Sequence, residues 1–361
     1  MKTAVAEVSL SALKHNLLQV KKLAKDSKIM AVCKANGYGH GLIKVAEALS
    51  DADAYGVARI EEAFKLRASG ISKSILLLEG FFSEEDIPVL SVNNFQTVIH
   101  TEQQLAQLEQ SNLDIPIKVW LKIDTGMSRL GISINQVEEF LARLKACPNV
   151  SDDIVAMTHL ACADEIDNEF NHTQIARFTR CVKAHNLSKT SVSNSAAVIT
   201  NLFYNSTWVR PGIMLYGVSP MQNSSGSENN LIPAMTFKTK IISIKSILTG
   251  DKVGYSGTWQ AKQDTNLAVI AVGYGDGYPR HAKNGTPVWL NGREVPLVGR
   301  VSMDMITVDL GPHSQDKIGD EVILWGNELA IERVAAWCDT IAYELLCQLT
   351  TRVEWKYINT D

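Results

Sequence analysis

The chain has 361 residues, of which 45% are hydrophobic and 20% are charged, and its formal net charge is −4. This composition is typical of a globular protein of about two domains. The mild acidity disfavours a nucleic-acid surface, which needs a basic stripe, and no apolar run reaches the roughly 20 residues of a membrane span.

The cysteines and histidines also exclude some kinds of site. The six cysteines are scattered without a CxxC pair, and the eight histidines show no HExxH spacing. We therefore expect no metal site and no disulfide framework. The N-terminus has no apolar signal-peptide segment, so the sequence predicts a reduced, cytoplasmic protein.

Residues 1–230 alternate short apolar runs with amphipathic helical stretches. The predicted helices are Ser9–Ser27, Gly41–Leu49, Ile60–Ala68, Glu102–Glu109, Gln136–Ala146 and Phe170–His185. The predicted strands are Ile29–Cys33, Ala54–Ala58, Ser74–Leu78, Phe95–His100, Ile117–Ile123, Ile154–His159, Thr190–Ser193 and Val209–Leu215. Helices between strands favour parallel pairing, so eight such units predict an α/β fold with an N-terminal (β/α)8, TIM-like barrel. No Rossmann glycine motif follows an early strand, which weakens a doubly wound alternative.

The composition changes after Pro220. Residues 221–230 are rich in Asn and Ser and are interpreted as a linker or surface loop. Beyond them the apolar period becomes two, which predicts a mostly β C-terminal domain over residues 231–361. Its predicted strands are Met235–Ile247, Leu267–Val272, Pro287–Leu290, Glu294–Val298, Met305–Leu310, Glu321–Trp325 and Val353–Ile358. One helix is predicted at Ala330–Leu349, and Asn291-Gly292 indicates a hairpin turn.

Lys34 stands where the first predicted strand meets a glycine-rich turn, in Lys34-Ala-Asn-Gly-Tyr-Gly-His-Gly41. A lysine at the end of a buried strand is costly to bury unless its amine is used, for example as a nucleophile or base. We expect the glycines at 37, 39 and 41 to let the backbone approach a ligand, with the Tyr38 phenol at the same mouth. The alternative is a strand-end lysine whose amine simply reaches water.

Polar side chains also follow later barrel strands. They are Lys122, Asp124, Arg129, His159, Asn194, Ser195 and Arg210. In a (β/α)8 barrel the active site lies at the carboxyl ends of the strands, and a phosphate site is frequent near strands seven and eight. Ser195 and the backbone near Gly212 occupy those places. A lysine amine together with a phosphate pocket suggests pyridoxal phosphate as cofactor.

Seven motifs occur in the order found in bacterial alanine racemases, and the chain resembles that family from about residue 5 to its C-terminus. The motifs are Lys34-Ala-Asn-Gly-Tyr-Gly-His-Gly, Lys122-Ile-Asp-Thr-Gly-Met-Ser-Arg129, Asn194-Ser-Ala-Ala, Arg210-Pro-Gly-Ile-Met-Leu-Tyr-Gly, Gly254-Tyr-Ser-Gly, Gly273-Tyr-Gly-Asp-Gly-Tyr and Val301-Ser-Met-Asp304. The resemblance implies a fold-type III pyridoxal-phosphate barrel with a β-rich C-terminal domain, which agrees with the division made from the apolar pattern.

The resemblance also implies a role for each matched residue. Lys34 bonds the cofactor covalently and, when released, exchanges the proton of D-alanine. Tyr255 exchanges the proton of L-alanine and comes from the partner subunit of a homodimer with shared active sites. Arg210 faces the pyridine nitrogen and, because arginine keeps its proton, weakens the ring as an electron sink. His159 links Arg210 to Tyr255. The phosphate is bound by Tyr38, Ser195, Gly212, Ile213 and Tyr343.

The substrate site follows from the same resemblance. Arg129 and the backbone N–H of Met303 hold the carboxylate of alanine, Asp304 is a supporting residue, and Tyr274 narrows the entrance. Lys122 lies beside Arg129, where two cations would repel. Some family members carry a carbamylated lysine there, and we expect the same of Lys122. The implied activity is interconversion of L-alanine and D-alanine, for peptidoglycan synthesis or for alanine catabolism.

Three alternatives stay open on the sequence. A basic amino-acid decarboxylase of the same architecture is disfavoured by Arg210, because those enzymes usually place a glutamate at the pyridine nitrogen. A non-catalytic pyridoxal-phosphate carrier is disfavoured by the C-terminal domain, which single-barrel carriers lack. A broad-specificity or serine racemase is disfavoured by the missing signal peptide and the missing membrane domain.

Overall fold

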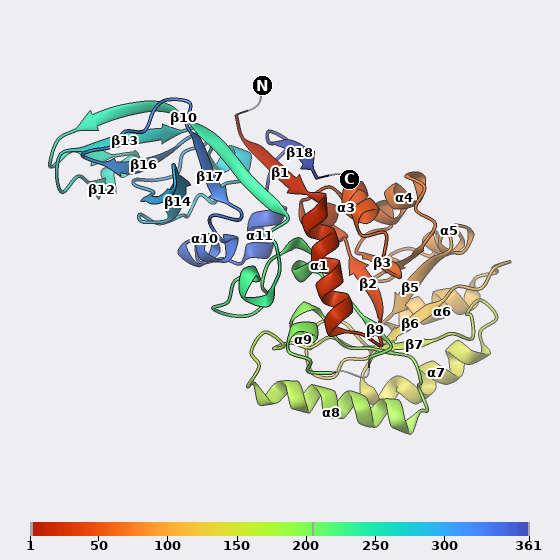
Figure 1. Cartoon of the computed structure of the whole chain (residues 1–361). Helices are drawn as coiled ribbons and strands as arrows, with labels where there is room; N and C mark the ends of the chain where they lie inside the picture. The colour runs from red at the N-terminus through yellow and green to blue at the C-terminus, as the bar shows by residue number, and fades with distance from the viewer. Residues whose placement is uncertain (1–2, 204–205, 360–361) are drawn as a thin grey trace.

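The protein, seen in a computed structural model that describes residues 3–203 and 206–359, has the predicted barrel and β-rich domain (Figure 1). The barrel is closed and parallel and is built from β2 (Lys28–Val32), β3 (Ala54–Val57), β4 (Ser74–Leu77), β5 (Phe95–Ile99), β6 (Val119–Lys122), β7 (Val155–Met157), β8 (Thr190–Ser191) and β9 (Trp208–Val209). Lys28 opposite Trp208 closes the ring. Buried side chains such as Met30, Trp120 and Trp208 fill its interior, so the barrel encloses a packed core and not a pore.

Helix α1 (Leu10–Leu23) precedes the first barrel strand, and further helices connect the barrel strands. The connecting helices are α2 (Lys34–Tyr38), α3 (Leu42–Ala48), α4 (Ile60–Ala68), α5 (Asp86–Val92), α6 (Glu102–Gln110), α7 (Val137–Ala146), α8 (Glu169–Ala184) and α9 (Ser195–Ile199). The side chain of Ser9 caps α1 by accepting a hydrogen bond from Ala12 N at 3.2 Å. Helix α5 was missed because Pro88 lies inside it; Pro88 falls in the first turn, where a missing N–H costs nothing.

The C-terminal domain is mostly β, as predicted. Its strands are β10 (Met235–Ile247), β11 (Lys252–Val253), β12 (Trp259–Gln260), β13 (Thr265–Ile270), β14 (Pro287–Leu290), β15 (Arg293–Pro296), β16 (Ile306–Gly311), β17 (Glu321–Trp325) and β18 (Glu354–Ile358). The predicted hairpin at Asn291-Gly292 joins β14 to β15. Both turn residues have positive φ, +46° and +82°, as a two-residue hairpin turn requires.

Strand β1 (Val5–Ser9) differs from the expected division of the chain. It lies in the C-terminal sheet, antiparallel to β10 and parallel to β18. A barrel domain of residues 1–230 is therefore wrong at its N-terminal end. The five residues of β1 precede a strong helical pattern, and nothing local shows that their partners lie more than 200 residues away.

The C-terminal helical region also differs from its prediction. The helix expected at Ala330–Leu349 is two helices, α10 (Ile331–Trp337) and α11 (Ala342–Cys347). Asp339 between them has a φ of +48°, which a continuing right-handed helix cannot include. The break reorients α11. On α10, Glu332 Oε1 accepts hydrogen bonds from Ser219 N at 2.8 Å and Gly226 N at 2.9 Å, so this carboxylate fastens the segment between the domains to α10.

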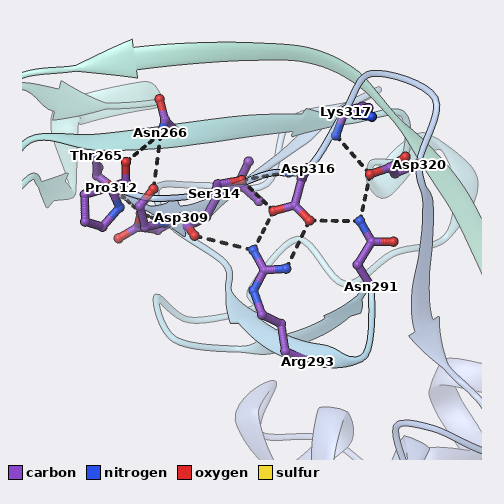
Figure 2. Close-up of polar contacts among 12 residues, drawn as sticks. Thr265, Asn266, Asn291, Arg293, Asp309, Pro312, Ser314, Asp316, Lys317 and Asp320 are labelled. Carbon is purple, nitrogen blue, oxygen red and sulfur yellow. Dashed lines mark hydrogen bonds and ion pairs between the residues drawn. The ribbon is translucent and has the colours of Figure 1, made fainter.

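A polar cluster in the C-terminal domain joins the β14–β15 hairpin to the loop before β17 (Figure 2). Its centre is Asp316, whose side chain is only 2% exposed. The Arg293 guanidinium donates to both carboxylate oxygens, at 3.0 and 2.5 Å. Asn291 and Ser314 donate to the same carboxylate at 2.9 and 2.6 Å. These partners, Arg293 first, hold the pKa of Asp316 well below its usual range.

Asp316→Asn is expected to lower the free energy of unfolding by about 1–3 kcal/mol at neutral pH. The loss is not larger because the Arg293 side chain is 41% exposed, and solvent screens its attraction to Asp316. The carboxylate's contribution is present above the unfolded pKa of about 3.9 and is lost as pH falls through the lower folded pKa. The difference between variant and native protein in urea unfolding should therefore shrink in acid. The control is Asp264→Asn, because the Asp264 carboxylate is exposed and also accepts a hydrogen bond from a threonine. An equal loss of unfolding free energy in Asp264→Asn would contradict the prediction.

No helix in residues 3–203 or 206–359 is both long and apolar enough to cross a membrane. Within the same residues, no group of three or more His, Cys, Asp or Glu side chains is placed to hold a metal ion.

Candidate active site

A cavity of about 730 Å³ lies at the carboxyl ends of the barrel strands and is closed on one side by α11. It brings together most of the residues singled out in the sequence. They are Lys34, Tyr38, Lys122, Arg129, His159, Ser195, Arg210, Gly212, Ile213 and Tyr343. Strand ends far apart in the sequence meet here because parallel strands of a closed barrel place their carboxyl ends on one rim.

Lys34 lies two residues after the end of β2 and is half-buried at the start of α2. The next residues, Ala35 to Gly37, all have positive φ, between +54° and +63°. Such a left-handed turn is costly for alanine and is held by its surroundings. Asn36 helps to hold it, since its Oδ1 accepts from Leu42 N at 3.0 Å.

The glycines of this turn serve a different purpose from the one expected. A Cβ on Gly39 would lie 2.0 Å from Leu346 O, and one on Gly41 would lie 2.0 Å from Tyr357 Oη. Trp355 Nε1 also donates to Gly39 O at 2.8 Å. Gly39 and Gly41 therefore leave room for α11 and β18. None of the glycines at 37, 39 and 41 lines the cavity, which differs from the expectation.

Tyr38 belongs to a stack of rings behind Lys34. The centre of its ring lies 4.7 Å from the centre of the Tyr216 ring. The centre of the His40 ring lies 4.8 Å from that of the same Tyr216 ring. A Cβ on Gly212 would meet Tyr38 Oη at 2.4 Å. A glycine at 212 thus leaves the phenol and the local backbone N–H groups side by side in the cavity. Burial keeps the pKa of Tyr38 well above its usual value, so the phenol stays a hydrogen-bond donor.

Ser195 lies at the same end of the cavity. It does not cap α9, because Asn194 does: Asn194 Oδ1 accepts from Ala197 N at 3.0 Å. Instead, Ser195 Oγ accepts from Gly212 N at 2.8 Å. This bond ties the segment after β8 to the segment after β9 and leaves the hydroxyl proton of Ser195 available to a ligand.

Arg210 is buried and is fixed from three sides. Its guanidinium donates to Ser191 Oγ at 2.5 Å and to Thr158 O at 2.7 Å, and Nη2 lies 3.4 Å from His159 Nδ1. Burial lowers the pKa of Arg210 to about 10, so it remains protonated at neutral pH. Burial and the surrounding cations, Arg210 foremost, hold the pKa of His159 well below its usual range, so the imidazole is neutral.

The cavity is strongly cationic. Lys122 is buried among Arg210, Arg129 and Lys34, and its burial and these cations lower its pKa to about 8. Among the described residues, no carboxylate lies within ion-pair distance of Lys122, and the acidic residues lining the cavity are Glu79 and Asp164. Such an excess of positive charge suits a ligand that carries a phosphate or carboxylate.

Tyr255, Tyr274, Met303 and Asp304 do not line this cavity. Tyr255 and Met303 are 68% and 52% exposed on the C-terminal domain. Tyr255 begins η4 (Tyr255–Gly257), between β11 and β12, and in Figure 1 β12 lies at the end of the domain remote from the barrel. Within one subunit, these four residues are not brought together with Lys34.

Several lining residues were not singled out from the sequence. They are Glu79, Asp164, Ile341 and Cys347. Glu79 follows β4, so the strand-end rule that found Lys122 would have found it too. Ile341 and Cys347 lie at the two ends of α11, which no local pattern places over the barrel.

The chain matches two family models, "Alanine racemase, N-terminal domain" over residues 8–220 and "Alanine racemase, C-terminal domain" over residues 234–357. It is 54% identical over 357 residues to alanine racemase of Vibrio parahaemolyticus and 52% identical over 358 residues to that of Yersinia pestis, covering 99% of each chain.

Solved structures agree. The fold matches biosynthetic alanine racemase from Pseudomonas aeruginosa with a TM-score of 0.96 at 41% identity, covering 99% of both chains. It matches alanine racemase from Acinetobacter baumannii with a TM-score of 0.93 at 38% identity, covering 99% of this chain and 100% of that one. Full-length identity above half and the shared two-domain fold show that the chain belongs to the alanine racemase family, a family of isomerases.

Proposed function

We propose that this protein interconverts L-alanine and D-alanine with pyridoxal phosphate as its cofactor. The observation that carries the proposal is that Lys34, Arg210 and the donors around Gly212 line one cationic cavity. A broader racemase would share these features, so alanine as the substrate rests on the family to which the chain belongs.

The cavity fits pyridoxal phosphate in its donor groups. The Tyr38 phenol, the Ser195 hydroxyl and the backbone at Gly212 and Ile213 would hold the phosphate, with Tyr343 beside them: the Tyr343 ring lies 6.0 Å from that of Tyr38. The amine of Lys34 would anchor the aldehyde end. When bound to an amino acid, the cofactor withdraws electrons from Cα and makes its proton acidic.

Arg210 sets how far that withdrawal goes. We place its guanidinium at the pyridine nitrogen, where a group that stays protonated donates a hydrogen bond and gives up no proton. The hydrogen bonds to Ser191 and Thr158 keep Arg210 in one orientation. A weaker electron sink favours simple return of a proton to Cα, and this disfavours the decarboxylase alternative, in which a carboxylate would occupy the position.

Two bases on opposite faces of Cα move the proton most directly. Lys34 would exchange the proton of D-alanine and Tyr255 that of L-alanine. Because Tyr255 is exposed on a domain tip and absent from the Lys34 cavity, we propose that it enters the cavity of a partner subunit. His159, 3.4 Å from Arg210, would then link Arg210 to that incoming phenol.

The substrate carboxylate would be shared between subunits in the same way. Arg129 lines the cavity, whereas the Met303 N–H, Asp304 and Tyr274 lie on the C-terminal domain and would arrive with Tyr255. A carboxylate held by both a guanidinium and a backbone N–H is fixed in orientation, so Cα lies between the two bases. The six free cysteines favour a reducing compartment, the cytoplasm, as the place of action.

Lys122 is expected to carry a carbamate. A pKa of about 8 leaves a fraction of its amine neutral at physiological pH, and a neutral amine adds CO₂ by forming an N–C bond and releasing one proton. The resulting anion would offset Arg129 and Arg210. Carbon-13 NMR after equilibration with labelled bicarbonate should show one carbamate signal that is lost in Lys122→Ala. A bare amine or a chloride ion in high-resolution density would contradict this prediction.

The activity is tested by incubating the purified protein and pyridoxal phosphate with L-alanine and separating the enantiomers by chiral chromatography. D-Alanine should accumulate to about equal amounts, since the two enantiomers have the same free energy in water. Release of CO₂ from lysine or ornithine, without D-alanine, would support the decarboxylase instead. Equal rates on L-serine would support a broader racemase.

A further inference from the structure

One guanidinium connects two turns of the C-terminal domain. Arg352, between α11 and β18, places Nε 3.1 Å from Asp276 Oδ1 and Nη2 2.8 Å from Asp304 Oδ1. Asp276 ends η5 (Tyr274–Asp276), and Asp304 directly follows Met303. Arg352 therefore ties together the two turns that carry Tyr274 and Met303.

The backbones of these two turns are also in direct contact. Tyr274 N donates to Ser302 O at 3.0 Å, and Gly275 N donates to Met303 O at 2.8 Å. A Cβ on Gly275 would lie 2.3 Å from Arg352 Nη1 and 2.9 Å from Met303 O. Glycine at 275 thus leaves room for the guanidinium to reach both carboxylates while the two backbones touch.

Arg352 balances the negative charges of Asp276 and Asp304. The Asp276 side chain is 8% exposed, and its Oδ2 accepts from Gly273 N at 3.0 Å. Of the residues that the structure describes, Arg352 is the only cation within 4.0 Å of either carboxylate. Without Arg352, the buried Asp276 carboxylate would lose this cation, and the Asp304 charge would stand uncompensated one residue from the Met303 N–H.

We propose that Arg352 is a positioning residue for the substrate carboxylate. It fixes the turn that presents the Met303 N–H, and it offsets the negative charge of Asp304, which would otherwise repel the carboxylate of alanine. This inference rests on the proposed function, in which Met303 binds substrate in the cavity of the partner subunit.

Arg352→Met should raise the KM for alanine about tenfold or more and change kcat by less than about threefold, because ground-state binding is weakened and neither base is touched. Hydrogen exchange of the amides of residues 274–275 should become faster in the same variant. The matched control is Arg333→Met, which removes a similarly exposed bidentate pair with Glu294 on the same domain. The control should keep the native KM and the native exchange at residues 274–275.

Two further variants separate charge from geometry. Adding Asp304→Asn to Arg352→Met should lower the KM again, because the repelling charge is gone. Arg352→Lys, which keeps a cation but cannot span both carboxylates, should give an intermediate KM and serves if Arg352→Met does not fold.

The role of Arg352 is overturned if KM and amide exchange stay native in both the Met and Lys variants, or if Arg333→Met raises KM equally. It is also overturned in its electrostatic part if Asp304→Asn does not lower the KM of Arg352→Met. The exchange measurement does not depend on racemisation. If the native protein had no racemase activity but amide exchange were faster in Arg352→Met, the proposed function would be overturned. The role of Arg352 in fixing the two turns would still hold.

Discussion

Lys34→Ala is expected to lower racemisation of alanine by about 10⁴-fold or more, because the variant loses both the covalent anchor of the cofactor and one of the two bases. The initial rate of D-alanine formation measures the loss. The visible absorbance of the protein should also disappear on dialysis, since only noncovalent contacts, those around Tyr38 and Ser195 and the one from Arg210, would remain to hold the cofactor.

Lys28→Ala is the matched control. Lys28 lies at the opposite end of β2, exposed, with its amine 5.5 Å from the Trp208 ring. Its removal should leave the rate within about twofold, as is usual for a surface substitution far from the reacting atoms. If Lys34→Ala kept more than about a tenth of the native rate, the role of Lys34 as a base would have to be abandoned.

Tyr255→Phe is expected to lower racemisation by about 10²–10⁴-fold, the usual contribution of one acid–base group. The cofactor absorbance should stay native, because Tyr255 does not line the cavity that contains Lys34. In heavy water, Lys34 should still exchange the Cα proton of D-alanine, whereas exchange from L-alanine should almost cease. Proton NMR of each enantiomer follows both reactions.

Tyr278→Phe provides the corresponding control. The Tyr278 phenol is buried in the same domain, and its oxygen has no hydrogen-bond partner among the residues that the structure describes. Its removal should leave the rate unchanged and stability equal or slightly higher, because an unsatisfied polar group is lost. Equal exchange of both enantiomers by Tyr255→Phe would remove Tyr255 as a base.

Mixing the two inactive variants tests whether active sites are shared. In a heterodimer of Lys34→Ala and Tyr255→Phe subunits, one site combines an intact Lys34 with an intact Tyr255 and the other has neither. Random reassortment should therefore restore about a quarter of the native activity, since half of the dimers are mixed and each has one working site. No recovery after subunit exchange would show that both bases come from one chain.

Much of the fold is evident from local patterns. The alternation of strands and helices predicted the barrel because each βαβ unit has its own periodic signal and a fixed handedness. Strand β1 and the break at Asp339 were not predictable in this way. The first depends on β10 and β18, which are distant in sequence, and the second depends on how α11 packs against the turn after Lys34.

The residues of the candidate site were likewise predictable only where a local pattern indicated them. Lys34, Lys122 and Arg210 could be identified because strand ends of a barrel share one rim. The true partners of the glycine turn and the hydrogen bond from Gly212 to Ser195 could not, because they join segments that the local pattern treats as independent. Arg352 gave no signal at all, since a single arginine before the last strand is most often a surface charge.

By itself the sequence determined the order of the elements and which residue types stand at each strand end, because both depend on local periodicity. Only the tertiary structure decided which of these residues meet. Closure of the barrel gathers Lys34 and Arg210 in one cavity, while the extended C-terminal domain keeps Tyr255 and Met303 away from it. That separation is a matter of long-range packing, and it is the physical reason to expect a second subunit at each site.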